Sequence, residues 1–128
     1  MTVIDAQSRI KKVSDLLQAI SLEPRLEILL AIGEGEACVC HLETVLGYRQ
    51  AYISQHLMAL REASLLNTRR DGKYIFYSLE NPKILEMVEL AAHLAGTDMS
   101  VVDTKAAHLH SSCDCPTCSK QAVPLATA

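Results

Sequence analysis

Five cysteines carry the clearest potential chemistry in this sequence of 128 residues. Cys38 and Cys40 are separated by one residue, and Cys113, Cys115 and Cys118 form a C-x-C-x-x-C group. The odd number and the clustering differ from a disulfide framework. In a reducing compartment, clustered thiols indicate metal ligands or redox groups. We therefore predict that these five cysteines bind a soft metal ion or act as a redox switch.

The first pair falls at the start of a predicted helix, where unpaired amides and the helix dipole favour the thiolate that binds metals. The alternative is that Cys38 and Cys40 are small buried hydrophobic residues, because free cysteine is often part of a core. The second group surrounds Pro116 in a polar segment, which does not fit a core. Three histidines near the thiols could also act as ligands, although a solvated or outer position is the simpler interpretation: His41, His108 and His110.

The chain is long enough to bring the two groups of thiols together. Sixteen residues separate Gly96 from Cys113, and such a segment spans about 22 Å as flexible coil and about 50 Å when extended. It can therefore reach residues 38–40 of the same subunit or of a partner. Thiolate-rich sites select soft ions such as Cd(II), Pb(II), Zn(II) or Cu(I), and a three-sulfur site suits As(III).

Helical spacing of apolar residues defines the elements that must position the first pair. It predicts an amphipathic helix over residues 8–20 and a second helix that begins near Pro24 and ends at Gly33. Two shorter helices, over residues 39–46 and 50–63, are joined by a turn that contains Gly47. This arrangement indicates a helix-turn-helix.

The second of these short helices carries hydrogen-bonding side chains suited to base edges and phosphates. We expect its exposed face to present Gln50, Tyr52, Ser54 and Gln55, with His56 either structural or DNA-facing. A solvated polar face that binds nothing is the alternative.

A hairpin signal follows at once. Asp71-Gly72 lies between two β-prone runs, and an Asp-Gly turn needs positive φ at both positions. Arg70 and Lys73 flank the turn, and Arg69 precedes it, so the tip is basic. Residues 49–73 carry five positive and two negative side chains in a chain of net charge −3. A helix-turn-helix followed by a basic hairpin predicts a winged helix, with its second short helix in the major groove and its tip at phosphate or the minor groove.

The last predicted helix begins at Asn81-Pro82 and ends at Gly96, with Ile84, Val88 and Ala91 on its apolar face. The first and last helices cannot both bury their apolar faces against so small a core, which favours a two-fold dimer. We expect a mainly α fold with a small β-hairpin: a dimeric winged helix-turn-helix domain over residues 8–96 and a flexible Cys-rich tail over residues 97–128.

Several classes of protein are disfavoured. No apolar run reaches the length of a membrane span, and the N-terminus does not have the character of a secretory signal, so we expect a cytoplasmic protein without a membrane partner. We do not expect an enzyme, because paired carboxylates, a Ser-His-Asp set and a Gly-rich phosphate loop are not apparent.

Taken together, these pieces resemble the ArsR/SmtB family of metal-responsive winged-helix repressors over about residues 8–96. The matching runs are Glu36-Ala37-Cys38-Val39-Cys40-His41-Leu42, Tyr52-Ile53-Ser54-Gln55-His56-Leu57, Leu60-Arg61-Glu62-Ala63, and Arg69-Arg70-Asp71-Gly72-Lys73-Tyr74-Ile75-Phe76-Tyr77-Ser78-Leu79. The resemblance implies a dimer that binds operator DNA and is released when its effector binds. The Cys-Val-Cys run resembles the arsenite-sensing and the cadmium- and lead-sensing branches.

The sequence departs from both branches. Glu43 stands where the arsenite pattern usually places a third cysteine, and His41 stands where Asp is usual. The cadmium and lead pattern usually takes further thiols from the N-terminus, whereas residues 1–37 contain none. The tail cysteines can replace them. Asn81 and Lys83 occupy the early part of the zinc-type site of the last helix, so we do not expect that site.

The sequence therefore predicts a homodimeric repressor that a soft metal ion (Cd, Pb or Zn) releases from operator DNA, with Cys38, Cys40 and tail thiols as ligands and Arg69, Arg70 and Lys73 on phosphates. Three alternatives remain open at this point: an arsenite or antimonite repressor with a three-sulfur site, a redox- or persulfide-sensing repressor, and a metal-buffering protein that binds no operator.

Overall fold

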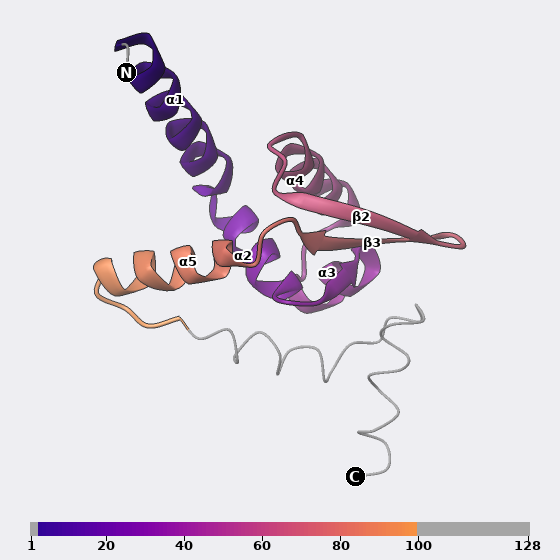
Figure 1. Ribbon diagram of the computed structural model, residues 1–128. Coiled ribbons are helices and arrows are strands. Elements are labelled where there is room, and N and C mark those ends of the chain that lie inside the picture. Colours follow the sequence, from indigo (N-terminus) through magenta and orange to yellow (C-terminus); the bar gives the residue numbers. More distant parts are fainter. Residues whose placement is uncertain (1–2, 100–128) are drawn as a thin grey trace.

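The computed structural model describes residues 3–99, which form helices around a small sheet (Figure 1). The predicted metal-binding group of Cys113, Cys115 and Cys118, together with His108 and His110, lies outside the described residues. Within residues 3–99, no helix is both long and apolar enough to span a membrane. The elements follow in the order α1 (Val3–Ile20), α2 (Glu23–Ile32), β1 (Glu36–Cys38), α3 (Val39–Leu46), α4 (Gln50–Glu62), β2 (Leu66–Asp71), β3 (Tyr74–Leu79) and α5 (Lys83–Leu94).

The helix-turn-helix is formed by α3 and α4, close to the predicted bounds. Gly47 ends α3 with φ of 76°, in the left-handed region that favours glycine, and its amide donates to the Glu43 carbonyl oxygen at 2.8 Å. Pro24 lies in the first turn of α2, where its missing amide costs no helical hydrogen bond. At the N-terminus, α1 begins at Val3, five residues earlier than the spacing predicted.

The sheet has three antiparallel strands in the order β1-β3-β2, not the two of the predicted hairpin. The additional strand is β1, which pairs with β3 so that Cys38 lies opposite Phe76. It places the first thiol inside the sheet at the point where the chain enters α3. The fold is therefore a winged helix-turn-helix, as predicted, with a third strand at the base of the wing.

The hairpin turn is displaced by one residue from the predicted position. Asp71 and Tyr74 form the last pair of the ladder, so the two-residue loop is Gly72-Lys73. Gly72 has φ of 61°, and Lys73 does not have positive φ. One positive φ at the first loop position is typical of a type II′ turn and not of the predicted type I′ turn. The shift leaves Lys73 at the tip of the wing.

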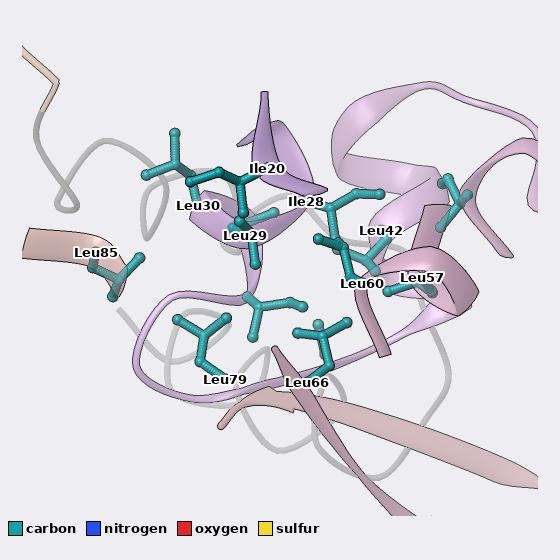
Figure 2. Close-up of a cluster of buried hydrophobic side chains, with 14 of the residues drawn as sticks. Ile20, Ile28, Leu29, Leu30, Leu42, Leu57, Leu60, Leu66, Leu79 and Leu85 are labelled. Carbon is teal, nitrogen blue, oxygen red and sulfur yellow. The ribbon is translucent and has the colours of Figure 1, made fainter. Parts of the chain in front are cut away.

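The core lies between α2, α3, α4 and the sheet (Figure 2). Aliphatic side chains from these elements are completely buried, including Ile28, Leu42, Ile53, Leu57 and Leu60. Each such side chain contributes about 1.5–3 kcal/mol when it is removed from water. This packing holds α4 in a fixed orientation relative to the wing.

Helices α1 and α5 extend on one side of the molecule, away from the wing (Figure 1). Lys83 is the first residue of α5, and its amide donates to the Asn81 side chain at 3.0 Å. The buried face of α5 consists of Leu85, Val88 and Ala92. Val88 belongs to the predicted apolar face, but Ala91 of that face remains exposed.

Candidate DNA interface and thiol site

The polar face of α4 is available to a partner. Gln50 and Gln55 are exposed and Ser54 is half-buried, while Ile53 and Leu57 on the opposite face are fully buried. This alternation follows the helical period, and it gives α4 one face for the core and one for solvent.

Tyr52 belongs only partly to this polar face. The residue is 41 % exposed, but its ring centroid lies 5.1 Å from that of Tyr48 and 4.6 Å from that of His56, with an edge contact to His56. The Tyr48 hydroxyl donates to a Glu27 carboxylate oxygen at 2.7 Å, and this hydrogen bond raises the pKa of Tyr48 to about 12. The aromatic contacts therefore brace the first turns of α4 against α2.

His56 lies on the inner face of α4 and not on the surface predicted to contact DNA. Its side chain is buried, and Nδ1 accepts a hydrogen bond of 3.2 Å from Nε of Arg25 on α2. Arg25 also donates to the Ala19 carbonyl oxygen at the end of α1 at 3.0 Å. Burial and the charge of Arg25 lower the pKa of His56, so the ring is held neutral. We therefore exclude His56 from the candidate DNA surface.

The three basic residues of the wing are all exposed, but they differ in their partners. Arg69 makes two hydrogen bonds to Glu36, at 2.7 and 3.0 Å, and its guanidinium lies 4.6 Å from the centroid of the Phe76 ring. The hydrogen bond from Arg69 lowers the pKa of Glu36. In contrast, neither Arg70 nor Lys73 forms an ion pair within residues 3–99. They are the better placed of the three to neutralise phosphates.

The thiols of Cys38 and Cys40 lie side by side, with 2.7 Å between their sulfur atoms. Cys38 is the last residue of β1 and the residue that caps α3, and its sulfur accepts from the amide of His41 at 3.4 Å. Two residues that are two apart point in nearly opposite directions within a helix, but this pair straddles the boundary between strand and helix. The change of backbone conformation brings both sulfurs to one place at the positive end of α3.

The two thiols differ in exposure, and a complete metal site is not present in the described part of the chain. Cys38 is 2 % exposed and Cys40 is half-buried. His41 is buried within the same turn of α3. Among residues 3–99, no three Cys, His, Asp or Glu side chains are grouped so that they could hold a metal ion. Residues 3–99 therefore bring two sulfur atoms together without a third side chain of these types beside them.

A second exposed surface lies on α1 and α5, far from the thiols. Large apolar side chains project from both helices: Ile10, Val13, Leu17, Leu90 and Leu94. Between these helices, Leu17, Val88 and Ala91 contribute to an apolar cavity of about 300 Å³. Such a surface is typical of a protein–protein interface and not of a DNA interface.

Comparison with known proteins identifies the family to which this architecture belongs. Residues 23–68 match the family described as "Bacterial regulatory protein, arsR family". The chain is 39 % identical over 88 residues to the biofilm growth-associated repressor of Xylella fastidiosa strain Temecula1, which covers 69 % of this chain and 77 % of the relative. It is 34 % identical over 82 residues to the cadmium resistance regulatory protein CadC of Listeria innocua, which covers 63 % of this chain and 69 % of the relative.

Two further comparisons extend the relationship. The arsenical resistance operon repressor of Escherichia coli K12 is 46 % identical over 65 residues, half of this chain and 56 % of the relative. The crystal structure of the repressor BigR from Xylella fastidiosa superposes with a TM-score of 0.63 at 36 % identity, over 73 % of this chain and 96 % of that one. With the helix-turn-helix, the wing and these relatives in agreement, the chain belongs to the arsR family of bacterial regulatory proteins and has the DNA-binding fold of a transcriptional regulator.

Proposed function

We propose that this protein is a homodimeric transcriptional repressor that leaves its operator when a soft metal ion binds Cys38 and Cys40 together with thiols of the tail. One observation carries the proposal: the two sulfurs lie 2.7 Å apart at the start of α3, the first helix of the helix-turn-helix. An ion bound there acts directly on the element that supports α4.

The DNA surface consists of the exposed face of α4 and the tip of the wing. Gln50, Ser54 and Gln55 supply donors and acceptors for base edges, and Tyr52 supplies a hydroxyl at the same end of the helix. Arg70 and Lys73 bind phosphates on either side of the groove that α4 enters. Arg69 stabilises the wing and does not bind a phosphate directly, because its guanidinium already donates two hydrogen bonds to Glu36.

The dimer is formed through α1 and α5. Their exposed apolar side chains include Ile10 and Leu94, which are 68 % and 79 % exposed in the single subunit. A second copy would remove these side chains from water, and a two-fold dimer matches the symmetry of a palindromic operator.

The inducing ion is of the soft, sulfur-binding class. Cys38 and Cys40 supply two thiolates, and Cys113, Cys115 and Cys118 supply one or two more. With four thiolates the site suits Cd(II), Pb(II) or Zn(II), and with three it suits As(III). The names of two relatives, a cadmium resistance regulator and an arsenical resistance repressor, support the same two groups of ions.

The test is a titration of the reduced dimer with Cd(II), and separately with As(III), in the presence of fluorescent DNA. The DNA is a duplex selected by the protein from a randomised pool. Ultraviolet thiolate-to-metal absorption counts the sulfur ligands, and fluorescence anisotropy follows release. We expect about four thiolates per Cd(II) and a loss of affinity of about 5- to 150-fold. Metal binding without any change in DNA affinity would refute the proposal.

Two sets of variants locate the ligands. The double variant C38S/C40S should bind the ion more weakly through fewer thiolates and should no longer release DNA, while it retains affinity for DNA. The triple variant C113S/C115S/C118S should reduce the number of thiolates to two and weaken binding of the ion. If the triple variant binds Cd(II) like the unmodified protein, the tail does not contribute.

The same pair of sulfurs makes oxidation a second candidate signal. The two sulfurs lie in contact at the start of a helix. A two-electron oxidant that takes two electrons and two protons from the thiols would join them in a disulfide bond. Release of DNA by hydrogen peroxide, combined with no effect of Cd(II) or As(III) under reductant, would favour this candidate over metal sensing.

A further inference from the structure

Three side chains form a continuous row across the sheet, from the thiols to the wing. In the ladder between β1 and β3, Cys38 lies opposite Phe76, and in the ladder between β2 and β3, Arg69 lies opposite the same Phe76. Directly opposed residues of neighbouring strands present their side chains on the same face of a sheet. The thiol, the aromatic ring and the guanidinium are therefore neighbours on one surface.

The contacts along this row are close. Phe76 is 1 % exposed and packs with Cys38 in a small buried cluster, against which Cys40 and Tyr74 also pack. The Arg69 guanidinium lies 4.6 Å from the centroid of the Phe76 ring, within the range of a cation–π contact. The ring thus has a thiol on one side and a wing cation over its face.

A second connection joins the same strands. Glu36 lies two residues before Cys38 on β1, so both side chains leave the strand on the same face. The Glu36 carboxylate holds Arg69 of β2 through two hydrogen bonds of 2.7 and 3.0 Å. Strand β1 is therefore connected to Arg69 directly through Glu36, as well as through the ring.

An ion that binds both sulfurs acts on the same strand. Cys38 is the last residue of β1, and its sulfur lies beside that of Cys40 at the start of α3. An ion that reorients the Cys38 side chain therefore acts on a residue that is 2 % exposed and packed against Phe76. Close-packed interiors respond to such a change by moving a neighbouring element.

We propose that Phe76 and the Glu36–Arg69 pair transmit the occupancy of the thiol site to the wing. This inference rests on the function proposed above and names the route of its regulation. When an ion binds the sulfurs and reorients Cys38, the Phe76 ring and β1 shift. The contacts of Arg69 with Phe76 and Glu36 then weaken, and β2 no longer holds the tip residues in the geometry that fits DNA.

The test compares Glu36→Ala with Glu34→Ala. Both variants remove one acidic side chain from the same short segment, but Glu34 is exposed and lies outside the row. For each, the affinity for the selected DNA duplex is measured with and without Cd(II), and thiolate-to-Cd(II) absorption is recorded. The ratio of the DNA affinity without Cd(II) to that with Cd(II) should be the same in Glu34→Ala as in the unmodified protein. Glu36→Ala should reduce that ratio by at least fivefold, with undiminished Cd(II) absorption.

Phe76→Leu provides the second variant, because it keeps an apolar side chain but removes the ring between Cys38 and Arg69. It should bind Cd(II) and show the same reduced ratio. If Glu36→Ala and Phe76→Leu both keep the ratio of the unmodified protein while they bind Cd(II), the route is wrong and the proposed function stands. If Cd(II) binds the unmodified protein but leaves its DNA affinity unchanged, the proposed function fails, and the route fails with it.

A measurement without DNA monitors the environment of Arg69 directly. In ¹H–¹⁵N spectra of the full-length protein, the Nε resonance of Arg69 is identified by its absence in Arg69→Lys. We expect it to shift when Cd(II) binds, because its hydrogen bond to Glu36 and its contact with the ring both change. An Arg69 resonance that stays in place at saturating Cd(II) would overturn the inference.

Discussion

The two sides of this molecule expose opposite kinds of surface. On one side, α1 and α5 present large apolar side chains, including Val13 and Leu90. On the other side lie α4 and the hairpin (Figure 1). Their exposed side chains include Gln50, Gln55 and the cations Arg70 and Lys73. An apolar surface gains free energy by leaving water, whereas a basic surface gains it by releasing the counterions of a polyanion. The two surfaces are therefore suited to different kinds of partner.

The largest effect is expected from a charge placed in the apolar surface. Leu17→Glu should dissociate the dimer, because a carboxylate cannot be buried there without a partner. A single subunit contacts only one half of the operator, so the affinity for the operator should fall by about 100-fold or more. Sedimentation velocity measures the dimer, and fluorescence anisotropy measures the affinity. Ser8→Glu adds the same charge on the opposite side of α1 and should leave both unchanged. A dimeric Leu17→Glu protein would show that the subunits meet elsewhere.

On the basic side, the double variant Arg70→Ala/Lys73→Ala should weaken operator binding and its dependence on salt. If both side chains contact phosphates, the slope of log affinity against log salt should become less steep by about 1.8 per subunit, since each contact contributes about 0.9. Arg69→Ala should change the slope less, because Glu36 already neutralises that guanidinium. Equal slopes for the double variant and the unmodified protein would remove the wing tip from the interface.

A smaller effect is expected at His56. This residue of α4 accepts a hydrogen bond from Arg25, which also donates to Ala19 at the end of α1. Burial and the charge of Arg25 lower the pKa of His56 below 6.5, so the unfolded chain binds a proton more readily than the folded one. The stabilisation by the neutral ring is complete above pH 6.5 and is lost as pH falls through the pKa of the folded state. Thermal unfolding between pH 5 and 7.5 should therefore show a steeper loss of stability on acidification in the unmodified protein than in His56→Gln. Parallel pH profiles would contradict this.

The smallest effect is expected at the corner between α4 and β2. Ser64 has φ of 63°, in the left-handed region that is unfavourable for a side chain with a Cβ. Ser64→Gly should raise the free energy of unfolding by about 0.5 kcal/mol, since the relief of strain exceeds the added freedom of the unfolded chain. The neighbouring Ala63 has φ of −80°, so Ala63→Gly should lower the free energy of unfolding by a similar amount. Urea denaturation of both variants checks the two signs.

Local patterns were sufficient for the elements whose signals are local. Gly47 and the apolar spacing predicted α3 and α4 almost to the residue, and the Asp71-Gly72 signal predicted the hairpin. The turn itself was displaced by one residue, because Asp71 pairs with Tyr74 and leaves Gly72 to supply the positive φ. Strand β1 was missed, since a strand of three residues is too short to show an alternating pattern.

Contacts between distant parts of the chain were not predictable from the sequence. His56 faces inward because Arg25, 31 residues earlier, donates to its ring. Arg69 is held on the sheet because Glu36, 33 residues earlier, lies on a neighbouring strand. Residue type and position in an element alone predicted Arg69 as a phosphate contact and His56 as either structural or DNA-facing. The sequence predicted Cys38 and Cys40 as metal or redox thiols, with small buried residues as the alternative. The burial of Cys38 against Phe76 depends on the sheet.

The position of β1 at the edge of the sheet has a consequence for how quickly the Cys38 sulfur can be reached. Within the described sheet, β1 is a three-residue strand that pairs on one side only, with β3. Short edge segments open locally at a lower free-energy cost than central strands, without unfolding of the whole domain. Cys38 is buried at the end of this strand, so a reagent can meet its sulfur only while β1 is open. The rate of capture then equals the fraction of time spent open multiplied by the intrinsic rate of the thiolate. The stability of one short strand thereby limits how quickly a reagent can reach Cys38.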